Sequence, residues 1–471
     1  MELNRQSIQA FPKLWLVFFS GLFLFLTVVV HQTGFSAGGN SVQYLPVVQR
    51  PFGEHWNIRY EVEGGYYVPI DLQNFEDSTY LVAGNIHYSS GDSDGWAMKV
   101  DDDGNTIWNK RIDQANSIEN VKKALPTVDG GVVLVGSIRA NGYSPASGWI
   151  IKLNSSGSIA WQKRYDEQDQ TQFYSVMQLG NGDIVVSGQA ELSQPYTNAQ
   201  ALVVRLTSSG DIVWGHTYGG QSTWEIAESV IPTNDGGLFV VGHAPQFFYD
   251  IWVMKLNSDG SVVWQKTYDS GGDDRAVAAV QRGDGSYLVA GWSQMPGGVI
   301  EGVVLLNLTA DGSVSFQKFI DVGRNPLVRS LDQTADNHYL IAGNSNSVNM
   351  NWVLKLDTDG NLIWSKGYFN NVHFTIPVTE VKEVASGQYL IAALTLDESN
   401  NRVMQLAKVN ALGELPGCND IVSLSVSVGN ITFSPENITN TTDDSFITVQ
   451  NGAALTENSS PGIWRVCSQI E

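Results

Sequence analysis

The strongest constraint on this chain is an internal repeat. A polar turn followed by a β-branched run recurs seven times, as STYLVAG, DGGVVLVG, NGDIVVSG, DGGLFVVG, DGSYLVAG, DNHYLIAG and SGQYLIAA. Successive copies end 49 to 54 residues apart, from Gly84 to Ala393. Self-similarity at such a period indicates a fold built from one repeated supersecondary unit.

A second pattern alternates with the first and supplies two more strands per repeat. It is an alternating apolar strand, a tight turn and an aromatic strand, as in GWAMKVDDDGNTIWNKRI and IWVMKLNSDGSVVWQKTY. Asp-Gly tolerates the positive φ of tight turns and is a strong hairpin signal. Each repeat therefore predicts four antiparallel strands, called a to d in chain order, with tight a–b and c–d turns.

The strand count favours a closed ring. Four-stranded units in series bury both faces of each sheet only against their neighbours, and closing the series gives a β-propeller. One strand d occurs before any complete repeat, as HWNIRY, whereas the seventh repeat runs into ELPGCND in place of its own. We therefore expect an all-β, seven-bladed β-propeller over residues 55–415, with the N-terminal strand from Trp56 to Tyr60 closing the last blade.

Ten of the fourteen tryptophans occupy repeat-locked positions. Those of strand d are Trp56, Trp108, Trp161, Trp214, Trp264 and Trp364, and those of strand c are Trp96, Trp149, Trp252 and Trp352. A position that recurs in step with the repeat is typical of packing between blades. We predict a structural role for these side chains.

The N-terminal 36 residues have the features of an export signal or a signal anchor. Arg5 and Lys13 precede an apolar run from Leu14 to Val30, and a small-x-small pair would allow cleavage after Ser36. Cleavage is favoured over a retained anchor. Residues 37–54 are a linker, and we expect a secreted, periplasmic or cell-surface protein.

Residues 416–471 leave the repeat and are rich in Ser, Thr and Asn. The only two cysteines, Cys418 and Cys467, lie in this segment, and an oxidising compartment favours a disulfide between them over two free thiols. The segment is predicted to be a small β-appendage closed by that disulfide, or a flexible surface stalk.

The charge balance bears on partners. With 27 Lys and Arg against 48 Asp and Glu, the net charge is -21. An acidic surface repels phosphate backbones, so nucleic acid is not expected as a partner. Membrane contact is expected only through an uncleaved N-terminal segment.

One face of the ring is predicted to carry function. The a–b and c–d turns share one face and are uniform, whereas the b–c and d–a loops on the other face are long and dissimilar, as binding loops are. Their aromatic residues are Tyr88, Tyr143, Tyr196, Trp224, Phe247, Phe248, Tyr249 and Trp292. Such aromatics would suit a sugar or a peptide, unless they tuck under their own loops.

No catalytic set or metal site is predicted. Asp101-x-Asp103-Gly-Asn and the copy at Asp357 resemble the start of a calcium loop, but the twelfth position counted from Asp357 is Tyr368, so both are interpreted as hairpin turns. The seven histidines show no ligand spacing, and the G-x-S-x-G match at 91–95 lies in a loop, away from any strand-to-helix elbow. No cofactor is expected.

The repeat resembles known propellers. The L-D/N-x-D-G-x-x-x-W pattern of strands c and d resembles quinoprotein-like propellers, which include periplasmic pyrroloquinoline-quinone dehydrogenases and outer-membrane assembly scaffolds. The whole unit is similar to exported bacterial and archaeal repeat proteins. The resemblance covers residues 55–415 and implies a propeller fold. Quinone dehydrogenases typically have eight blades and, in some, a vicinal cysteine pair, and this chain departs from both features.

Three functional hypotheses follow. The favoured one is a non-catalytic exported scaffold that binds a protein or glycan through the long-loop face. The second is a polysaccharide hydrolase or lyase that uses acids such as Asp92, Asp94, Asp250 or Asp274, which would require two of them to converge on one cleft. The third is a quinone-binding oxidoreductase.

Overall fold

The computed structural model describes most of residues 55–415 and seven short stretches between 421 and 465. Gaps in the first part cover 115, 141–144, 167–169, 192–198, 220–223, 246–247, 295–300, 324–325, 346–349, 369–377, 386, 397–398 and 400. The chain divides into two compact units, Met1–Val42 and Gln43–Glu471, and the described residues belong to the second. The predicted export signal, the linker and both cysteines lie outside the described residues.

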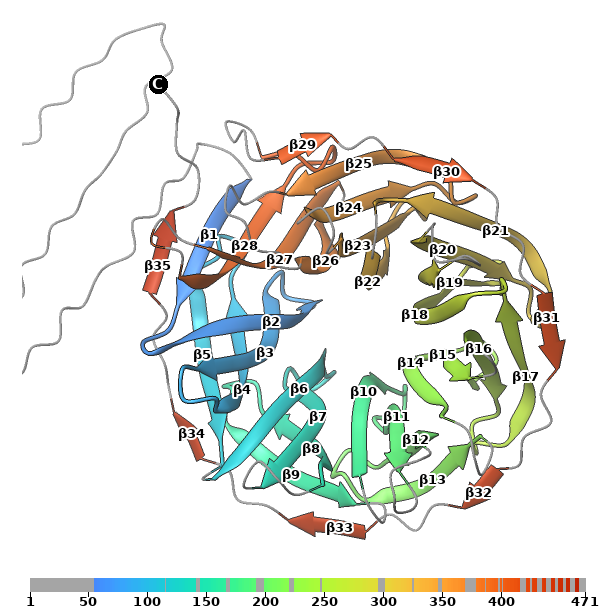
Figure 1. The fold of residues 1–471 in the computed structure, drawn as a ribbon. Helices are drawn as coiled ribbons and strands as arrows, with labels where there is room; N and C mark the ends of the chain where they lie inside the picture. Colours follow the sequence, from blue (N-terminus) through green and yellow to red (C-terminus); the bar gives the residue numbers. More distant parts are fainter. Residues whose placement is uncertain are drawn as a thin grey trace, which may run out of the picture. The chain divides into compact units, whose positions relative to one another are not determined.

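Seven antiparallel sheets form a ring, which confirms the predicted seven-bladed β-propeller (Figure 1). Each sheet has four strands from the repeat, with strand a innermost and strand d toward the rim. Among the described residues, no helix is long and apolar enough to cross a membrane.

The first six blades take their four strands in chain order. Blade 1 contains β2 (Gly65–Asn74), β3 (Tyr80–Tyr88), β4 (Ser93–Val100) and β5 (Thr106–Asp113). Blade 2 contains β6 (Ser117–Pro126), β7 (Val132–Ala140), β8 (Ser147–Leu153) and β9 (Ile159–Asp166). Blade 3 contains β10 (Gln170–Gln178), β11 (Ile184–Glu191), β12 (Ala199–Leu206) and β13 (Ile212–Tyr218). Blade 4 contains β14 (Ile226–Pro232), β15 (Leu238–Pro245), β16 (Tyr249–Leu256) and β17 (Val262–Asp269). Blade 5 contains β18 (Asp273–Gln281), β19 (Tyr287–Gln294), β20 (Glu301–Leu308) and β21 (Val314–Asp321). Blade 6 contains β22 (Pro326–Gln333), β23 (Tyr339–Ser345), β24 (Met350–Leu356) and β25 (Leu362–Tyr368).

Blade 7 joins the two ends of the repeat array. It consists of β26 (Val378–Ala385), β27 (Gln388–Leu396), β28 (Arg402–Val409) and β1 (Trp56–Glu61). β1 pairs antiparallel with β28, with Trp56 opposite Lys408 and Tyr60 opposite Met404. The N-terminal strand therefore supplies the missing strand d, as the sequence predicts.

The tight turns adopt the geometry that the Asp-Gly pattern requires. Gly104 and Gly312, in two c–d turns, have φ of 79° and 76°, a region that L side chains rarely adopt. Asp101 accepts hydrogen bonds from the backbone N–H groups of Asp103 and Asn105, at 3.0 and 2.7 Å. Its carboxylate caps the turn, which supports interpreting this motif as a hairpin turn.

Two repeated positions of strand d join most blades to the next. In five blades the Trp indole N–H donates to a carbonyl of the following c–d turn, and the Tyr four residues later donates to the Gly carbonyl of the same turn. The Trp pairs are Trp56–Asp102, Trp161–Ser208, Trp214–Ser258, Trp264–Ala310 and Trp364–Ala411, at 2.8 to 3.2 Å. The Tyr pairs are Tyr60–Gly104, Tyr165–Gly210, Tyr218–Gly260, Tyr268–Gly312 and Tyr368–Gly413, at 2.5 to 3.0 Å. We call this contact the Trp–Tyr latch. Because β1 carries it, the closure of the ring uses the same bonds as four other joints.

Blades 1 and 5 lack the tyrosine of the latch. Ile112 and Ile320 take its place, so no hydroxyl reaches the following turn. The strand c tryptophans Trp96, Trp149 and Trp252 are at most 1% exposed and fill the space between sheets. These burials agree with the structural role predicted for the tryptophans of strand c.

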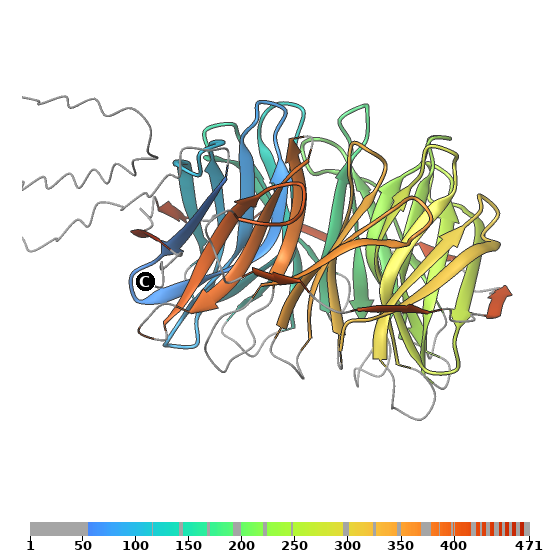
Figure 2. The ribbon, with the colours of Figure 1, turned by 90° about the horizontal axis from the view of Figure 1, so that it is seen from above.

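The C-terminal segment adds a fifth, outermost strand to every blade. Its strands are β29 (Ile421–Ser423), β30 (Ser427–Gly429), β31 (Ser434–Asn437), β32 (Thr442–Asp444), β33 (Thr448–Asn451), β34 (Leu455–Glu457) and β35 (Gly462–Arg465). They pair in that order with blades 6, 5, 4, 3, 2, 1 and 7. This outer belt therefore follows the ring backward, and Figure 2 shows its strands along the rim. The described strands of this segment belong to the propeller sheets, which the sequence analysis did not anticipate.

Candidate functional site

The long b–c and d–a loops lie at one end of the ring, called the loop face. Figure 2 shows the tight a–b and c–d turns along the opposite end. Strands a and c begin at the loop face and strands b and d end there, so residues at those strand ends surround it. Of the predicted aromatic residues, Tyr143, Tyr196 and Phe247 lie outside the described residues.

An arginine is stacked between two of the predicted aromatics at blades 4 and 5. The guanidinium carbon of Arg275, at the start of β18, lies 4.2 Å from the ring centre of Tyr249 and 5.1 Å from that of Trp292. Phe248 precedes Tyr249 and is 60% exposed. We call these four residues the aromatic–arginine patch. Arg275 therefore lies over both aromatic rings, and the exposed apolar side chain belongs to the residue that precedes Tyr249.

Two other predicted aromatics lie elsewhere on the loop face. Tyr88 ends β3, is half-buried, and has the guanidinium of Arg111 5.3 Å from its ring centre. Trp224 is half-buried beside the bridge to Ala199, in the connection that leads to β14. Arg275 thus links Tyr249 and Trp292, with Phe248 adjacent to Tyr249 in the sequence, whereas Tyr88 lies in another blade.

The four acids considered for catalysis fall into two groups, one at blade 1 and one at blades 4 and 5. Asp92 is exposed, and its Oδ1 accepts the N–H of Ser93 at 3.0 Å. Asp250 and Asp274 are buried at blades 4 and 5, whereas Asp94 is buried in blade 1. These acids are therefore split between two regions of the ring.

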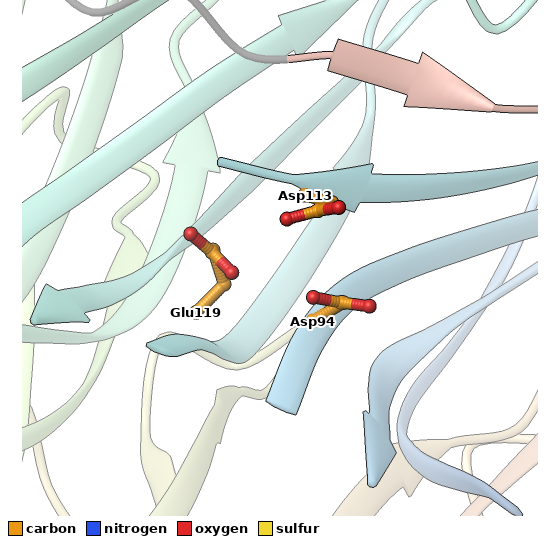
Figure 3. A group of neighbouring side chains, drawn as sticks. All are labelled: Asp94, Asp113 and Glu119. Atoms are coloured by element: carbon orange, nitrogen blue, oxygen red, sulfur yellow. The ribbon is translucent and has the colours of Figure 1, made fainter. Parts of the chain in front are cut away.

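Asp94 instead meets two acids that the sequence analysis did not select. Asp94 begins β4, Asp113 ends β5 and Glu119 lies near the start of β6, so the cluster joins blades 1 and 2 (Figure 3). One oxygen from each carboxylate lies within 4.8 Å of the others. Asp94 and Glu119 are fully buried, and Asp113 is 36% exposed.

Arg111 and Ser117 donate hydrogen bonds to this carboxylate cluster, and the Tyr88 phenol and the backbone of Gln114 also act on it. Arg111 Nε donates to Asp94 Oδ2 at 2.5 Å, and Arg111 Nη2 donates to Asp113 Oδ2 at 3.0 Å. Ser117 Oγ donates to Glu119 Oε1 at 2.5 Å. Three carboxylates thus face a single guanidinium.

The pKa values of the buried acids respond to this environment. Burial raises the pKa of Glu119 to about 7, with the nearby Asp94 and Asp113 adding to the rise and the Ser117 hydroxyl opposing it. Burial also raises the pKa of Asp94, although the Arg111 guanidinium opposes that shift. Glu119 is therefore protonated in a substantial fraction of molecules at neutral pH.

The innermost strands share an irregularity at one repeat position. Each of the seven innermost strands has a β-bulge at one repeat position, occupied by Ile70, Lys122, Tyr174, Glu228, Val277, Arg329 and Thr379. Burial raises the pKa of Glu228 to about 7, although Lys122, Arg275 and Arg329 oppose the rise. Because these groups belong to blades 2, 4, 5 and 6, their charges meet across the axis.

Comparisons with known proteins support no family assignment. No family model and no curated protein matches the chain. Solved structures with a similar fold include a protein of unknown function from Dyadobacter fermentans, with a TM-score of 0.45 and 10% identity over 74% of this chain and 95% of that one. The polysaccharide lyase Uly1 gives a TM-score of 0.46 and 7% identity over 75% and 99%. Puromycin hydrolase gives 0.43 and 12% over 74% of this chain and 54% of its own. These similarities concern the fold and carry no argument about activity, and the predicted quinoprotein-like relationship finds no family match.

Proposed function

We propose that this protein is an exported scaffold that binds a protein or a glycan through its loop face. The aromatic–arginine patch is the observation that carries the proposal. Phe248 is exposed to solvent although it is apolar, and Tyr249 and Trp292 are held by Arg275 in an arrangement that leaves them half-buried. Aromatic and arginine side chains are enriched where proteins bind their partners.

The Trp–Tyr latch supports a scaffold role. It joins neighbouring blades at the turn end of the ring in five of the seven blades, away from the loop face. Sequence differences among the loops can therefore serve recognition without changing the joints between blades. Export of the propeller is proposed from the N-terminal apolar segment alone.

Binding assays with a matched pair of variants test the proposal. We would screen the full chain against a glycan array and against extracellular proteins, and compare Phe248→Ala with Val263→Ala. Val263 is 53% exposed and precedes Trp264 near the c–d turn, away from the loop face. Loss of a ligand in Phe248→Ala with retention in Val263→Ala is the expected result. Equal binding by both variants, or no ligand for the folded chain, would contradict the proposal.

A further inference from the structure

We propose that Asp94, Asp113 and Glu119 form a binding site for a divalent cation such as Ca²⁺ at the boundary of blades 1 and 2. This inference is independent of the aromatic–arginine patch, which lies at blades 4 and 5. It assigns to the loop face a metal site that sequence analysis did not predict.

Two buried carboxylate oxygens of the cluster lack hydrogen-bond partners. Asp94 Oδ1 and Glu119 Oε2 are inaccessible to solvent, and neither accepts a hydrogen bond from the residues that the structure describes. An orphaned buried carboxylate oxygen is costly, and a metal ion is one way to satisfy it. This observation is separate from the closeness of the three acids.

One oxygen of each residue is not engaged by Arg111 or Ser117. Arg111 engages Oδ2 of both aspartates, and Ser117 engages Oε1 of Glu119. Asp94 Oδ1 and Glu119 Oε2 remain, together with Asp113 Oδ1, for which no hydrogen bond occurs within the described part of the chain. Oxygens bound to one Ca²⁺ at about 2.3–2.6 Å lie within about 5 Å of one another. The 4.8 Å limit on the mutual separations in the cluster fits that requirement.

The propeller contains an internal comparison. The strand register places Asp250, Asp269 and Asp274 of blades 4 and 5 at the repeat positions of Asp94, Asp113 and Glu119. There, Ser270 donates its N–H to Asp274 Oδ2 at 2.7 Å and its hydroxyl to Oδ1 at 2.8 Å. Protein donors thus satisfy both oxygens of Asp274, whereas one oxygen of the equivalent Glu119 stays without a donor.

Charge also favours a cation at this place. Three carboxylates face the single guanidinium of Arg111, so full ionisation leaves an excess of two negative charges. The nearby phenol of Tyr88 is neutral, since burial raises its pKa. A proton on Glu119 or a divalent cation can relieve the repulsion, and the two compete because a metal binds the ionised carboxylate. Asp113 is 36% exposed and offers the cation a route from solvent.

Calorimetric titration of the full chain with Ca²⁺ tests the site, and parallel titration with Mg²⁺ shows which cation is preferred. After chelator treatment and dialysis, we expect binding of one Ca²⁺ with a Kd of about 0.1–1 mM at about pH 8, as in extracellular calcium modules. Affinity should fall as the pH is lowered, because protons compete with the metal ion for carboxylate oxygens. The absence of saturable binding by the folded chain of either cation at about pH 8 would overturn the proposal.

Variants separate this site from the general acidity of the protein. Asp113→Asn changes the partly exposed ligand and Glu119→Gln a buried one, and each should weaken binding about tenfold or more. Asp269→Asn is the matched control, because Asp269 is exposed and occupies the repeat position of Asp113. It should bind as the unchanged chain does. If Glu119→Gln does not fold, Asp113→Asn still decides the question. Unchanged binding in Asp113→Asn, or an equal loss in Asp269→Asn, would refute the assignment.

Discussion

The contact between a c–d turn and the preceding blade can be measured by adding one methyl group at Gly312. A Cβ on this residue would lie 2.8 Å from two indole carbons of Trp264 and 3.1 Å from the Tyr268 hydroxyl. The φ of 76° adds backbone strain to this collision. Gly312→Ala therefore perturbs the Trp–Tyr latch between blades 4 and 5 and the turn conformation together.

A second glycine isolates the two contributions. Gly236, in the a–b turn of blade 4, has φ of 81°, and a Cβ there would meet no atom within 4 Å. Gly236→Ala should cost about 1–2 kcal/mol, the usual penalty for a left-handed L-residue. Gly312→Ala should cost a further 1–3 kcal/mol or so, because Trp264 must shift in a close-packed joint. We expect a total of about 2–5 kcal/mol for Gly312→Ala.

Guanidinium unfolding followed by tryptophan fluorescence provides the assay. Both variants and the unchanged chain should show similar m-values, so that differences in midpoint convert into free energies of unfolding. A loss in Gly312→Ala that exceeds the loss in Gly236→Ala supports the latch as a tight joint. Equal losses would refute the reasoning, because backbone strain alone would then explain both variants.

Three other predictions concern the latch, the carboxylate cluster and the belt. Tyr268→Phe should lower the free energy of unfolding by about 1–3 kcal/mol, because the buried Gly312 carbonyl loses its hydrogen-bond donor. An unchanged free energy of unfolding in the same denaturation assay would contradict this prediction. The pKa of Glu119 is raised from 4.5 to about 7 in the folded protein. The protonated carboxyl therefore contributes its full stabilisation below about pH 4.5, and this contribution is lost as the pH rises through about 7. With a chelator present, the free energy of unfolding of the unchanged chain should fall between about pH 5 and pH 8, and Glu119→Gln should make this fall smaller by up to about 3 kcal/mol. The same pH dependence in both proteins would contradict this prediction. Truncation after Leu415 removes β29–β35 and exposes the edge of the outer strand of each blade. Light scattering should then detect self-association, while circular dichroism retains the β signal. A monodisperse truncated chain would contradict this prediction.

The blades could be predicted because their signals repeat. Trp264 and Tyr268 recur at the same spacing in other repeats, and each copy reinforces the assignment of strand d. The missing strand d after Leu415 could be predicted for the same reason, since an incomplete unit shows clearly against complete ones. Tight turns followed from Asp-Gly and neighbouring polar residues, whose backbone requirements are local.

The belt carries no comparable signal. Its strands have three or four residues each, too short for a side-chain alternation to stand out. Strands such as β29 and β32 pair through backbone groups, and backbone pairing leaves little trace in residue identity. The Ser, Thr and Asn content therefore suggested a separate appendage.

The carboxylate cluster was missed because its members are single residues on three strands of two blades. Asp94 was considered among loop acids, but nothing local connects it with Asp113 or Glu119. Alignment of the repeats by the Gly that ends strand b could have found them, since it places Asp250 at the position of Asp94. The orphaned oxygens depend on side-chain packing, which the repeat alone does not determine.

The position of β1 has a consequence for the order in which the protein assembles. β1 pairs with β28 on one side and with β35 on the other, and both neighbours follow it by more than three hundred residues. During synthesis or translocation it emerges before the blades but can adopt its place only after them. Such a large sequence separation imposes a slow final step, because the chain loses much conformational freedom before the pairing is formed. After β1 has paired with both β28 and β35, opening the ring at this blade requires the hydrogen bonds of β1 to both neighbouring strands to break.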